Sequence, residues 1–420
     1  MNADIQYMKS TLLIIGFVYP EPNSSAAGTR MLQLINFFKN QNYTVLFATS
    51  CKKSQHAIDL ESVNVQVVEI LLNDSSFDDF ARELNPEVVL FDRFMTEEQF
   101  GWRIAENCPN AIRVLDTEDL HFLRKTRQKA QIYSSFSLDD FSSSDIAKRE
   151  IASIYRSDLS LIISEIEFGI LKDTFKIDCA LLLYLPFMLD FNDNSYNLQH
   201  KSFEERTDFV SIGNFLHPPN LDAVYHLKND IWPLIKSHLP KVNLHIYGAY
   251  ETQEIRSLNN KKDGFIFHGY VEDSFKVVNS ARVLLAPLRF GAGLKGKLIQ
   301  AMQCGTPSAM STIAAEGMFG SEQPNGIIEN EASLFVEKCI DLYTQKPLWS
   351  EYQSNGYSII KSRYNQEEHH LKLKKRISLL KSTIQSHRSN NFIGQLLGYH
   401  QFQSTKYLSR WIEAKNTNLE

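Results

Sequence analysis

The sequence has little of what marks several common classes of protein. No apolar run approaches the roughly 20 residues of a membrane span. The apolar residues 11–18 follow no basic leader and end at Tyr19-Pro20, so we expect a strand there and not a signal peptide. Cysteines are few and odd in number, and no pair has metal-ligand spacing, which suits reduced thiols in a cytoplasm. They are Cys51, Cys108, Cys179, Cys304 and Cys339.

An excess of positive charge is also missing. The formal net charge is −5 and the isoelectric point is near 6.2, which argues against a general nucleic-acid binder. An anionic ligand must therefore be met by a local cationic site. Hydrophobic residues at 43% and charged residues at 22% are ordinary for a soluble globular protein, and 420 residues predict two domains.

Apolar runs and helical periodicity alternate along the chain twice. This alternation predicts α/β domains, each with a parallel sheet covered on both faces. In the first half we expect a helix over 28–40 and strands over 11–18, 43–49, 63–71, 88–91, 111–115 and 159–164. In the second half we expect strands over 209–213, 243–248, 265–268, 283–287 and, more weakly, 307–310. Two doubly wound domains favour a ligand in the cleft between them, at the carboxyl ends of the strands.

The expected domains are 1–190 and 205–375, with an asparagine-rich linker at 191–204 and a helical tail at 376–420. The stretch 131–145 is rich in serine and aspartate and is typical of a loop. Residues 365–390 predict a charged helix, and residues 391–420 carry aromatics at loose helical spacing. This tail is interpreted as a terminal helix docked on the body, or else as a segment that binds a membrane surface or a partner.

The segment from Phe290 to Pro307 carries the strongest chemical signal. It follows a buried strand and places three glycines, Lys295 and Lys297 before a helical pattern. Glycines allow a close backbone approach, and a helix N-terminus with two lysines favours a polyanion, most plausibly a diphosphate. A glycine-rich turn with solvated lysines is the alternative. A Walker P-loop is excluded because Leu298 stands where Ser or Thr is needed.

Residues 208–320 resemble the donor-binding domain of family 4 glycosyltransferases, which have the GT-B fold. Three segments carry this resemblance: 210–220, 267–273, and the glycine loop continued through Thr312 to Met318. The N-terminal half fits more loosely, through Tyr19-Pro20 and the Ala27–Arg30 segment. The likeness covers roughly residues 10–375. It implies the fold class α/β, with two Rossmann-like doubly wound domains that face a central cleft.

The resemblance also implies an activity: retaining, metal-independent transfer of a sugar from a nucleoside-diphosphate sugar to an acceptor, with no further cofactor. Family precedent suggests cell-envelope polysaccharide or glycolipid assembly with a glycan or lipid-linked acceptor. It also suggests a cytoplasmic protein, either free or peripheral at the inner membrane face. Lys295 and Lys297 would stabilise the leaving diphosphate, and His121 or Asp119 would orient the acceptor hydroxyl. The residues expected to meet the donor are Gly28, Arg30, Gly213, Asn214, His217, Gly291, Gly293, Gln300, Thr312, Glu316 and Gly317.

The sequence departs from the family at several of these positions. The family's two glutamates would fall at Ala292 and Gln300, neither of which is acidic. Glutamine still donates and accepts hydrogen bonds but lacks the charge. The usual Arg and Lys pair after the Gly213 strand is replaced by Asn214 and His217, so neutralising the diphosphate falls to the two loop lysines. A catalytically silent binding protein and a sugar-nucleotide epimerase therefore stay open as alternatives.

Individual residues have plainer interpretations as well. The Asp116–His121 segment is equally an acidic cap that opens a helix, and a metal cluster of Asp116, Asp119 and His121 is a further alternative. Arg30 is equally a solvated arginine at a helix start.

Overall fold

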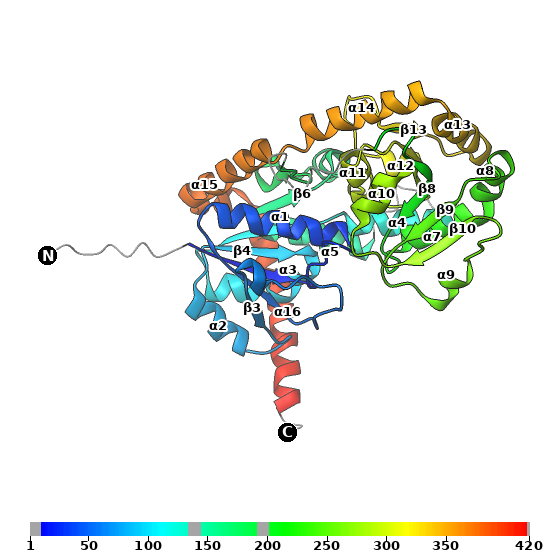
Figure 1. The fold of residues 1–420 in the computed structure, drawn as a ribbon. Coiled ribbons are helices and arrows are strands. Elements are labelled where there is room, and N and C mark those ends of the chain that lie inside the picture. The colour runs from blue at the N-terminus through cyan, green and yellow to red at the C-terminus, as the bar shows by residue number, and fades with distance from the viewer. Residues whose placement is uncertain (1–9, 133–143, 191–200, 418–420) are drawn as a thin grey trace.

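Two parallel β-sheets organise the chain, which we describe from a computed structural model over residues 10–132, 144–190 and 201–417 (Figure 1). The first sheet has seven strands in the order β3-β2-β1-β4-β5-β6-β7. Neighbouring strands are parallel throughout. The strands are β1 (Thr11–Gly16), β2 (Thr44–Thr49), β3 (Gln66–Glu69), β4 (Val88–Asp92), β5 (Ile112–Asp116), β6 (Leu159–Ile162) and β7 (Leu182–Tyr184).

The second sheet has six strands in the order β10-β9-β8-β11-β12-β13 and is parallel as well. The strands are β8 (Thr207–Ile212), β9 (Leu244–Tyr247), β10 (Phe265–Gly269), β11 (Ala281–Ala286), β12 (Ser308–Met310) and β13 (Gly326–Ile328). The expected α/β architecture of two Rossmann-like halves is confirmed, and every expected strand is present. The expectations did not include β7 and β13, which have three residues each and are too short to show a periodicity.

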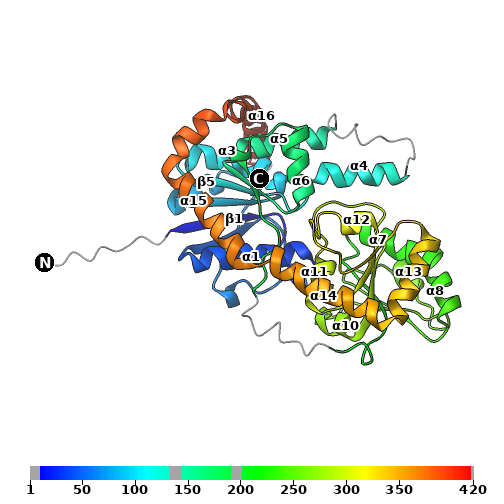
Figure 2. The ribbon, with the colours of Figure 1, turned by 90° about the horizontal axis from the view of Figure 1, so that it is seen from above.

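Helices cover both faces of each sheet (Figures 1 and 2). Those of the first half are α1 (Ala26–Asn40), α2 (Ser76–Leu84), α3 (Arg93–Asn107), α4 (His121–Ile132), α5 (Asp145–Arg156) and α6 (Glu165–Gly169). Those of the second half are α7 (Pro218–His226), α8 (Trp232–His238), α9 (Gln253–Ser257), α10 (Ser274–Ser280), α11 (Gly296–Gln303), α12 (Thr312–Ala315) and α13 (Ala332–Thr344). Three longer helices follow: α14 (Lys346–Arg363), α15 (Gln366–Asn390) and α16 (Phe392–Thr417).

Strand periodicity places the core on both faces of each sheet. In β1 the side chains of Leu13 and Ile15 pack into one buried cluster, while Leu12 and Ile14 pack into the cluster on the opposite face. All four side chains are fully buried. Successive side chains of a strand point to opposite faces, so a continuous apolar run marks a strand covered on both sides.

The last helices return to the first domain. Leu373, Ile377 and Leu380 of α15 pack in the core beneath α1, and α16 lies against α3 and α5 (Figure 2). The interpretation of the tail as a docked terminal helix therefore fits the arrangement. The boundary expected at residue 375 falls inside α15, and the domain bounds remain a prediction. Most of the expected linker (191–200) and of the serine-rich loop (133–143) lies outside the described residues.

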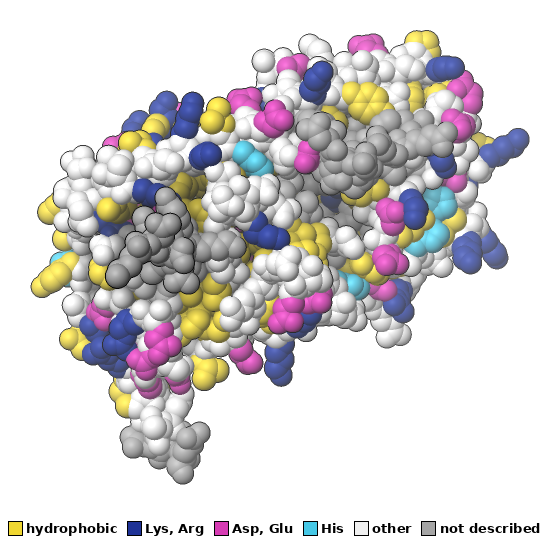
Figure 3. All heavy atoms as spheres, turned by 60° about the vertical axis from the view of Figure 1, so that its left-hand side comes forward, with side chains coloured by type: hydrophobic (Ala, Val, Ile, Leu, Met, Phe, Trp, Pro, Cys, Tyr) yellow, Lys and Arg dark blue, Asp and Glu magenta, His cyan; other side chains and the backbone are white. Residues whose placement is uncertain are grey.

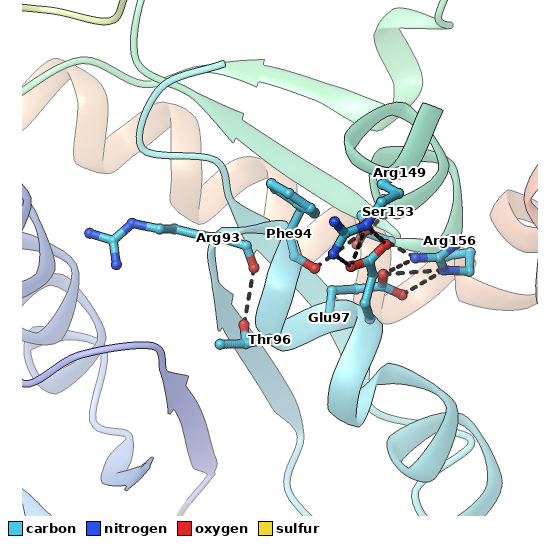
Figure 4. Close-up of polar contacts among 9 residues, drawn as sticks. Arg93, Phe94, Thr96, Glu97, Arg149, Ser153 and Arg156 are labelled. Atoms are coloured by element: carbon cyan, nitrogen blue, oxygen red, sulfur yellow. Dashed lines mark hydrogen bonds and ion pairs between the residues drawn. The ribbon is translucent and has the colours of Figure 1, made fainter. Parts of the chain in front are cut away.

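A buried ion pair fastens α5 to α3. Both Arg156 and Glu97 are almost fully buried, and Arg156 Nε donates to Glu97 Oε1 over 2.9 Å. Arg156 Nη2 also donates to Ser153 Oγ over 2.9 Å. Figure 4 shows this cluster between the two helices, with the side chain of Arg93 pointing away from it. The pair fixes the two helices that carry Arg93 and Glu150, both of which reach the candidate site described below.

Within the described residues, no helix is long and apolar enough to cross a membrane.

Candidate functional site

Each sheet has one point where the strand order reverses, and the two points face each other. The reversals lie between β1 and β4 and between β8 and β11. In parallel α/β sheets, ligands bind at these points, outside the carboxyl ends of the strands. The loop that follows β11 is the glycine loop, residues 287–295. The start of α11, directly after this loop, meets the first domain, since a Cβ added to Gly296 would lie 2.7 Å from Ala26 Cβ.

The glycine loop is enclosed by the first domain. Ala292 packs in the same buried cluster as Leu115 and Leu120. Gly293 has a φ of +64°, in the left-handed region that favours glycine. A Cβ at this position would stand 3.0 Å from Asp119 Cβ. The two domains therefore meet closely at the predicted polyanion site.

Of the two predicted lysines, Lys295 is buried at this interface and Lys297 is partly buried within the second domain. Lys295 Nζ donates to the carbonyl oxygens of Ala292 (3.1 Å) and Gly293 (2.6 Å), and Lys297 Nζ donates to Asn220 Oδ1 over 2.8 Å. Burial lowers the pKa of Lys295 to about 8. Burial, with the charge of Lys295, lowers the pKa of Lys297 to about 7. An anion placed between them would favour their charged forms and raise both pKa values.

Asn220 links the loop after β8 to Lys297, because its side chain contacts both. Asn220 Nδ2 donates to the Asn214 carbonyl over 2.9 Å. A Cβ at Gly213 would come within 2.7 Å of Asn220 Cγ, so the glycine allows this close approach. His217 directly precedes α7, and burial together with the charge of Arg124 lowers its pKa to about 4. The structure thus brings Gly213, Asn214 and His217 to the lysines, as expected.

Asp119 and His121 also reach the interface. The Asp119 carboxylate accepts from Arg124 Nε over 2.7 Å, and its Oδ1 lies 3.4 Å from His121 Nε2. Burial raises the pKa of Asp119, but the charge and hydrogen bond of Arg124 together with the nearby His121 and His217 outweigh it and hold the pKa well below its usual range. Burial lowers the pKa of His121 to about 4, so this imidazole is neutral at pH 7. A neutral imidazole can accept a hydrogen bond from a hydroxyl.

The N-terminus of α4 is capped by distant carboxylates and not by Asp119, which corrects the capping alternative. Glu150 of α5 accepts from the backbone N–H groups of His121 and Phe122, at 3.1 and 3.0 Å. Glu167 Oε1 accepts from Leu120 N (3.1 Å) and, across the domain boundary, from Gly293 N (2.8 Å). Burial, with the charge of Asp119, raises the pKa of Glu167 to about 7.

Arg30 does not reach the predicted diphosphate position, and it is not solvated either. Its side chain is fully buried. Nε and Nη2 donate to Asp116, at 2.9 and 2.8 Å to Oδ1, while Nη1 donates to the Leu185 carbonyl over 2.6 Å. All three nitrogens are used inside the first domain, which also removes Asp116 from the metal cluster considered with Asp119 and His121. The helical spacing of α1 could not show which carboxylate lies opposite Arg30.

The remaining predicted donor residues lie in three places: within the second domain, at the start of α1, and at the interface between the domains. Gln300 Nε2 donates to Ser274 Oγ over 2.7 Å, and the exposed Thr312 bonds to Asn330, so both are paired within the second domain. Gly28 lets the preceding loop fold back, because its Cβ would lie 2.4 Å from the Glu21 backbone. Gly291, Glu316 and Gly317 all lie at the interface. Glu316 forms an ion pair with Arg127 of α4, and a Cβ at Gly317 would lie 2.7 Å from Ser164 Oγ.

Several residues at the interface were not among the predicted ones. Arg124, Arg127 and Glu167 act across the domain boundary, which no local pattern reveals. Arg93 and Glu118 follow β4 and β5 with φ of +70° and +63°. Backbone strain of this kind gathers at functional sites. Burial and the charge of Asp116 raise the pKa of Glu118 to about 8.

Comparison of the sequence with models of known protein families gives a match in the second domain. Residues 206–345 match the model of the family described as Glycosyl transferases group 1. The second domain therefore belongs to the glycosyl transferases group 1 family, as the resemblance of residues 208–320 predicted. A curated relative, an uncharacterized 44.6 kDa protein in the cps region of Klebsiella pneumoniae, is 21% identical over 192 residues. That alignment covers 44% of this chain and 48% of the relative, so the chain spans about half the length of the curated relative it matches.

Solved structures show that the fold is GT-B. Sucrose-phosphate synthase from Thermosynechococcus elongatus is 15% identical, with 89% of this chain and 100% of that chain covered and a TM-score of 0.67. HepE from Anabaena in complex with UDP is 13% identical, with 88% and 100% covered and a TM-score of 0.62. WaaG, a glycosyltransferase involved in lipopolysaccharide biosynthesis, is 11% identical, with 86% and 98% covered and a TM-score of 0.59.

Proposed function

We propose that the protein is a retaining, metal-independent glycosyltransferase that moves a sugar from a nucleoside-diphosphate sugar to an acceptor. The observation that carries this proposal is the position of the glycine loop. The loop lies at the strand-order reversal of the second sheet, brings the buried Lys295 next to the partly buried Lys297 of α11, and faces the loops of the opposite domain.

The chemistry of the transfer fits these residues. Breaking the anomeric C–O bond leaves negative charge on the diphosphate, and cations held in a water-poor site stabilise that charge most. Lys295 and Lys297 would be the cations that stabilise the charge on the diphosphate. Lys295 is buried in the interface and Lys297 is partly buried next to it, and both have lowered pKa values. Because the loop is buried against the first domain, the domains must separate for the donor to enter.

On the acceptor side we propose that His121 or Asp119 orients the attacking hydroxyl. The two side chains lie 3.4 Å apart next to Gly293. The neutral imidazole can accept a hydrogen bond from the hydroxyl, and the adjacent carboxylate can hold the ring in place. The proposed acceptor is a glycan or a lipid-linked saccharide.

For the donor we propose a UDP-sugar, used in polysaccharide or glycolipid assembly. Structures of HepE contain UDP, UDP with glucose, and UDP-glucose. WaaG is involved in lipopolysaccharide biosynthesis, and the Klebsiella relative is in a cps region. These are properties of those proteins, and they guide the choice of ligands to test here.

Thermal stabilisation by UDP-, GDP-, ADP- and dTDP-sugars tests the donor site. A ligand that binds only the folded state must stabilise it, by about 2.7 kcal/mol at a hundredfold excess over Kd. We expect UDP-sugars to raise Tm for the wild type and not for Lys295→Ala/Lys297→Ala. The matched control is Lys261→Ala/Lys262→Ala, a pair of exposed lysines in the same domain. An equal rise in the loop variant would contradict the proposed diphosphate site.

The identity of the product separates the remaining alternatives. A glycosyltransferase yields a glycosylated acceptor with retained anomeric configuration, whereas an epimerase yields an isomerised sugar nucleotide. A silent binding protein shows ligand-dependent stabilisation but no product. NMR of the reaction mixture distinguishes all three outcomes.

We further propose that α16 rests weakly on a membrane surface, so that the enzyme is peripheral at the cytoplasmic face. Large apolar and aromatic side chains are exposed along it among polar ones: Phe392, Ile393, Leu396, Tyr399, Tyr407, Leu408 and Trp411. Arg410 and Lys415 lie on the same helix, and Figure 3 shows hydrophobic, basic and acidic side chains together above its protruding end. Aromatics with basic residues favour the interface of a bilayer.

Sedimentation with vesicles that contain anionic lipid tests this placement. We expect wild-type protein to bind more weakly as salt rises, and Tyr407→Glu/Trp411→Glu to lose binding. The control Leu371→Glu/Leu379→Glu changes two exposed apolar side chains of α15 instead. Equal binding of both variants would remove α16 from the proposal.

A further inference from the structure

Arg127 reaches from the first domain to two donor-site segments of the second. It lies on α4, which leaves the end of β5 and extends beside the second domain (Figure 2). Arg127 Nη1 donates to the Gly291 carbonyl and to Glu316 Oε1, both over 2.8 Å. Nη2 donates to Glu316 Oε2 over 2.9 Å. The side chains of Arg127 and Glu316 are 12% and 21% exposed, so the contact is largely shielded from solvent.

The planar guanidinium sets the geometry of both segments. A two-pronged arginine–carboxylate pair fixes the plane of the carboxylate as well as its distance. The hydrogen bond from Arg127 Nη1 to the Gly291 carbonyl ties the glycine loop to the same side chain. The backbone that follows Glu316 is constrained too, since Gly317 has a φ of +74° and packs against Ser164 of the first domain. One arginine therefore holds the glycine loop and Glu316 in a fixed relation when the domains meet.

The same contact keeps Glu316 away from the loop lysine. The negative charge of Glu316 raises the pKa of Lys295, and the positive charge of Arg127 lowers it, so the three charges lie within electrostatic range of one another. Without Arg127, the carboxylate would be left in a shielded site with Lys295 as the nearest cation. A lysine paired with Glu316 is a poorer partner for a diphosphate, because the carboxylate already neutralises it.

We infer that Arg127 is a positioning residue for the donor sugar: it orients Glu316 toward the sugar hydroxyls and leaves Lys295 free for the diphosphate. This inference rests on the proposed function. It also bears on the missing Arg and Lys pair after β8, since a Glu316 carboxylate paired with Arg127 leaves the charge of Lys295 to the diphosphate. The role needs a bidentate fork, so a lysine cannot replace it.

The test compares the dissociation constants of UDP and of the UDP-sugar that stabilises the protein, for wild type, Arg127→Ala and Arg127→Lys. Both variants should bind UDP more weakly than the wild type, because Glu316 then pairs with Lys295 and reduces its attraction for the diphosphate. The sugar strengthens binding relative to UDP alone, and this gain in affinity should be about tenfold smaller in each variant. A factor of about ten corresponds to the loss of one hydrogen bond to a charged group. Turnover should fall more in kcat than donor KM rises. Arg149→Ala is the control, because this half-exposed arginine of α5 pairs with Glu98 within the first domain.

A double-variant cycle shows whether Arg127 acts through Glu316. If it does, Arg127→Ala/Glu316→Gln should lose no more sugar-dependent affinity than the more severe single variant. Independent, multiplying losses would overturn the inference, and so would an Arg127→Ala protein that keeps the sugar-dependent affinity within twofold. A wild-type protein that binds neither UDP nor a UDP-sugar would overturn the proposed function itself, and this inference with it.

Discussion

At the scale of single residues, the most informative group is a carboxylate that spans the two domains. Glu167 Oε1 accepts backbone hydrogen bonds from Leu120 and from Gly293, and burial raises its pKa to about 7. The unfolded chain would release this proton near pH 4.3, well before the folded protein does. Between those values the folded state binds more protons, so this group makes the protein less stable as the pH rises.

We therefore expect the unfolding free energy of the wild type to fall, relative to that of Glu167→Gln, between about pH 4.5 and pH 7. Glutamine keeps an oxygen acceptor for Gly293 N–H but does not titrate. Urea denaturation at a series of pH values measures the difference. A constant difference across this range would show that the Glu167 carboxyl titrates normally.

Arg30 and Asp116 offer a second residue-scale prediction. Both side chains are fully buried and bound to each other. Removing one partner leaves an unpaired buried charge, so Arg30→Met should cost about 3–5 kcal/mol of stability. Arg82→Met, which breaks an exposed pair with Asp79, should cost at most about 1 kcal/mol. Equal losses by chemical denaturation would mean that the buried pair is not structural.

At the scale of elements, the sequence was most informative where a signal is local. The apolar run of β1 and the spacing of Met31, Leu34 and Ile35 in α1 define their elements without the rest of the chain. The cap of α4 could not be predicted, because Glu150 comes from a helix further along the chain. Likewise, the sequence of the glycine loop predicts a polyanion site, but it does not predict the contacts of the loop with Glu167 and Arg127, because those depend on how the domains meet.

The glycine loop gives the element-scale prediction. Gly293→Ala forces a left-handed residue to carry a Cβ, which costs about 1–2 kcal/mol, and places that atom 3.0 Å from Asp119 Cβ. We expect lower thermal stability and weaker binding of UDP-sugars. In Gly169→Ala, the control, the nearest atom to the new Cβ lies 3.9 Å away in a helix, so little should change. Unchanged stability of Gly293→Ala would mean that the loop is not held in this conformation.

At the scale of the whole molecule, the contact between the domains explains why predicted donor residues are already occupied. The N–H of Gly293 binds Glu167, and Tyr250 Oη donates to Glu21 Oε1 of the first domain over 2.6 Å. Protein groups thus fill positions that the proposed function gives to the donor. We expect contacts between the two domains to break when the cleft opens, and contacts between the protein and the nucleotide sugar to replace them.

A variant that keeps the domains apart tests this exchange. The Cβ of Gly296→Val would lie 2.7 Å from Ala26 Cβ, so the side chain has no room in the closed interface. We expect a larger radius of gyration by small-angle X-ray scattering, retained UDP binding by the second domain, and reduced turnover. A variant as compact and as active as the wild type would show that the reaction does not require this interface.

The most direct measurement of the central claim is release of UDP from a UDP-sugar that stabilises the protein, with water in place of the acceptor. We expect slow, saturable release by the wild type, and release at least tenfold slower from Lys295→Ala/Lys297→Ala, since each 1.36 kcal/mol of lost transition-state stabilisation is a factor of ten in rate. Release at the same rate from both proteins, or a tightly bound UDP-sugar that neither protein ever cleaves, would contradict the account.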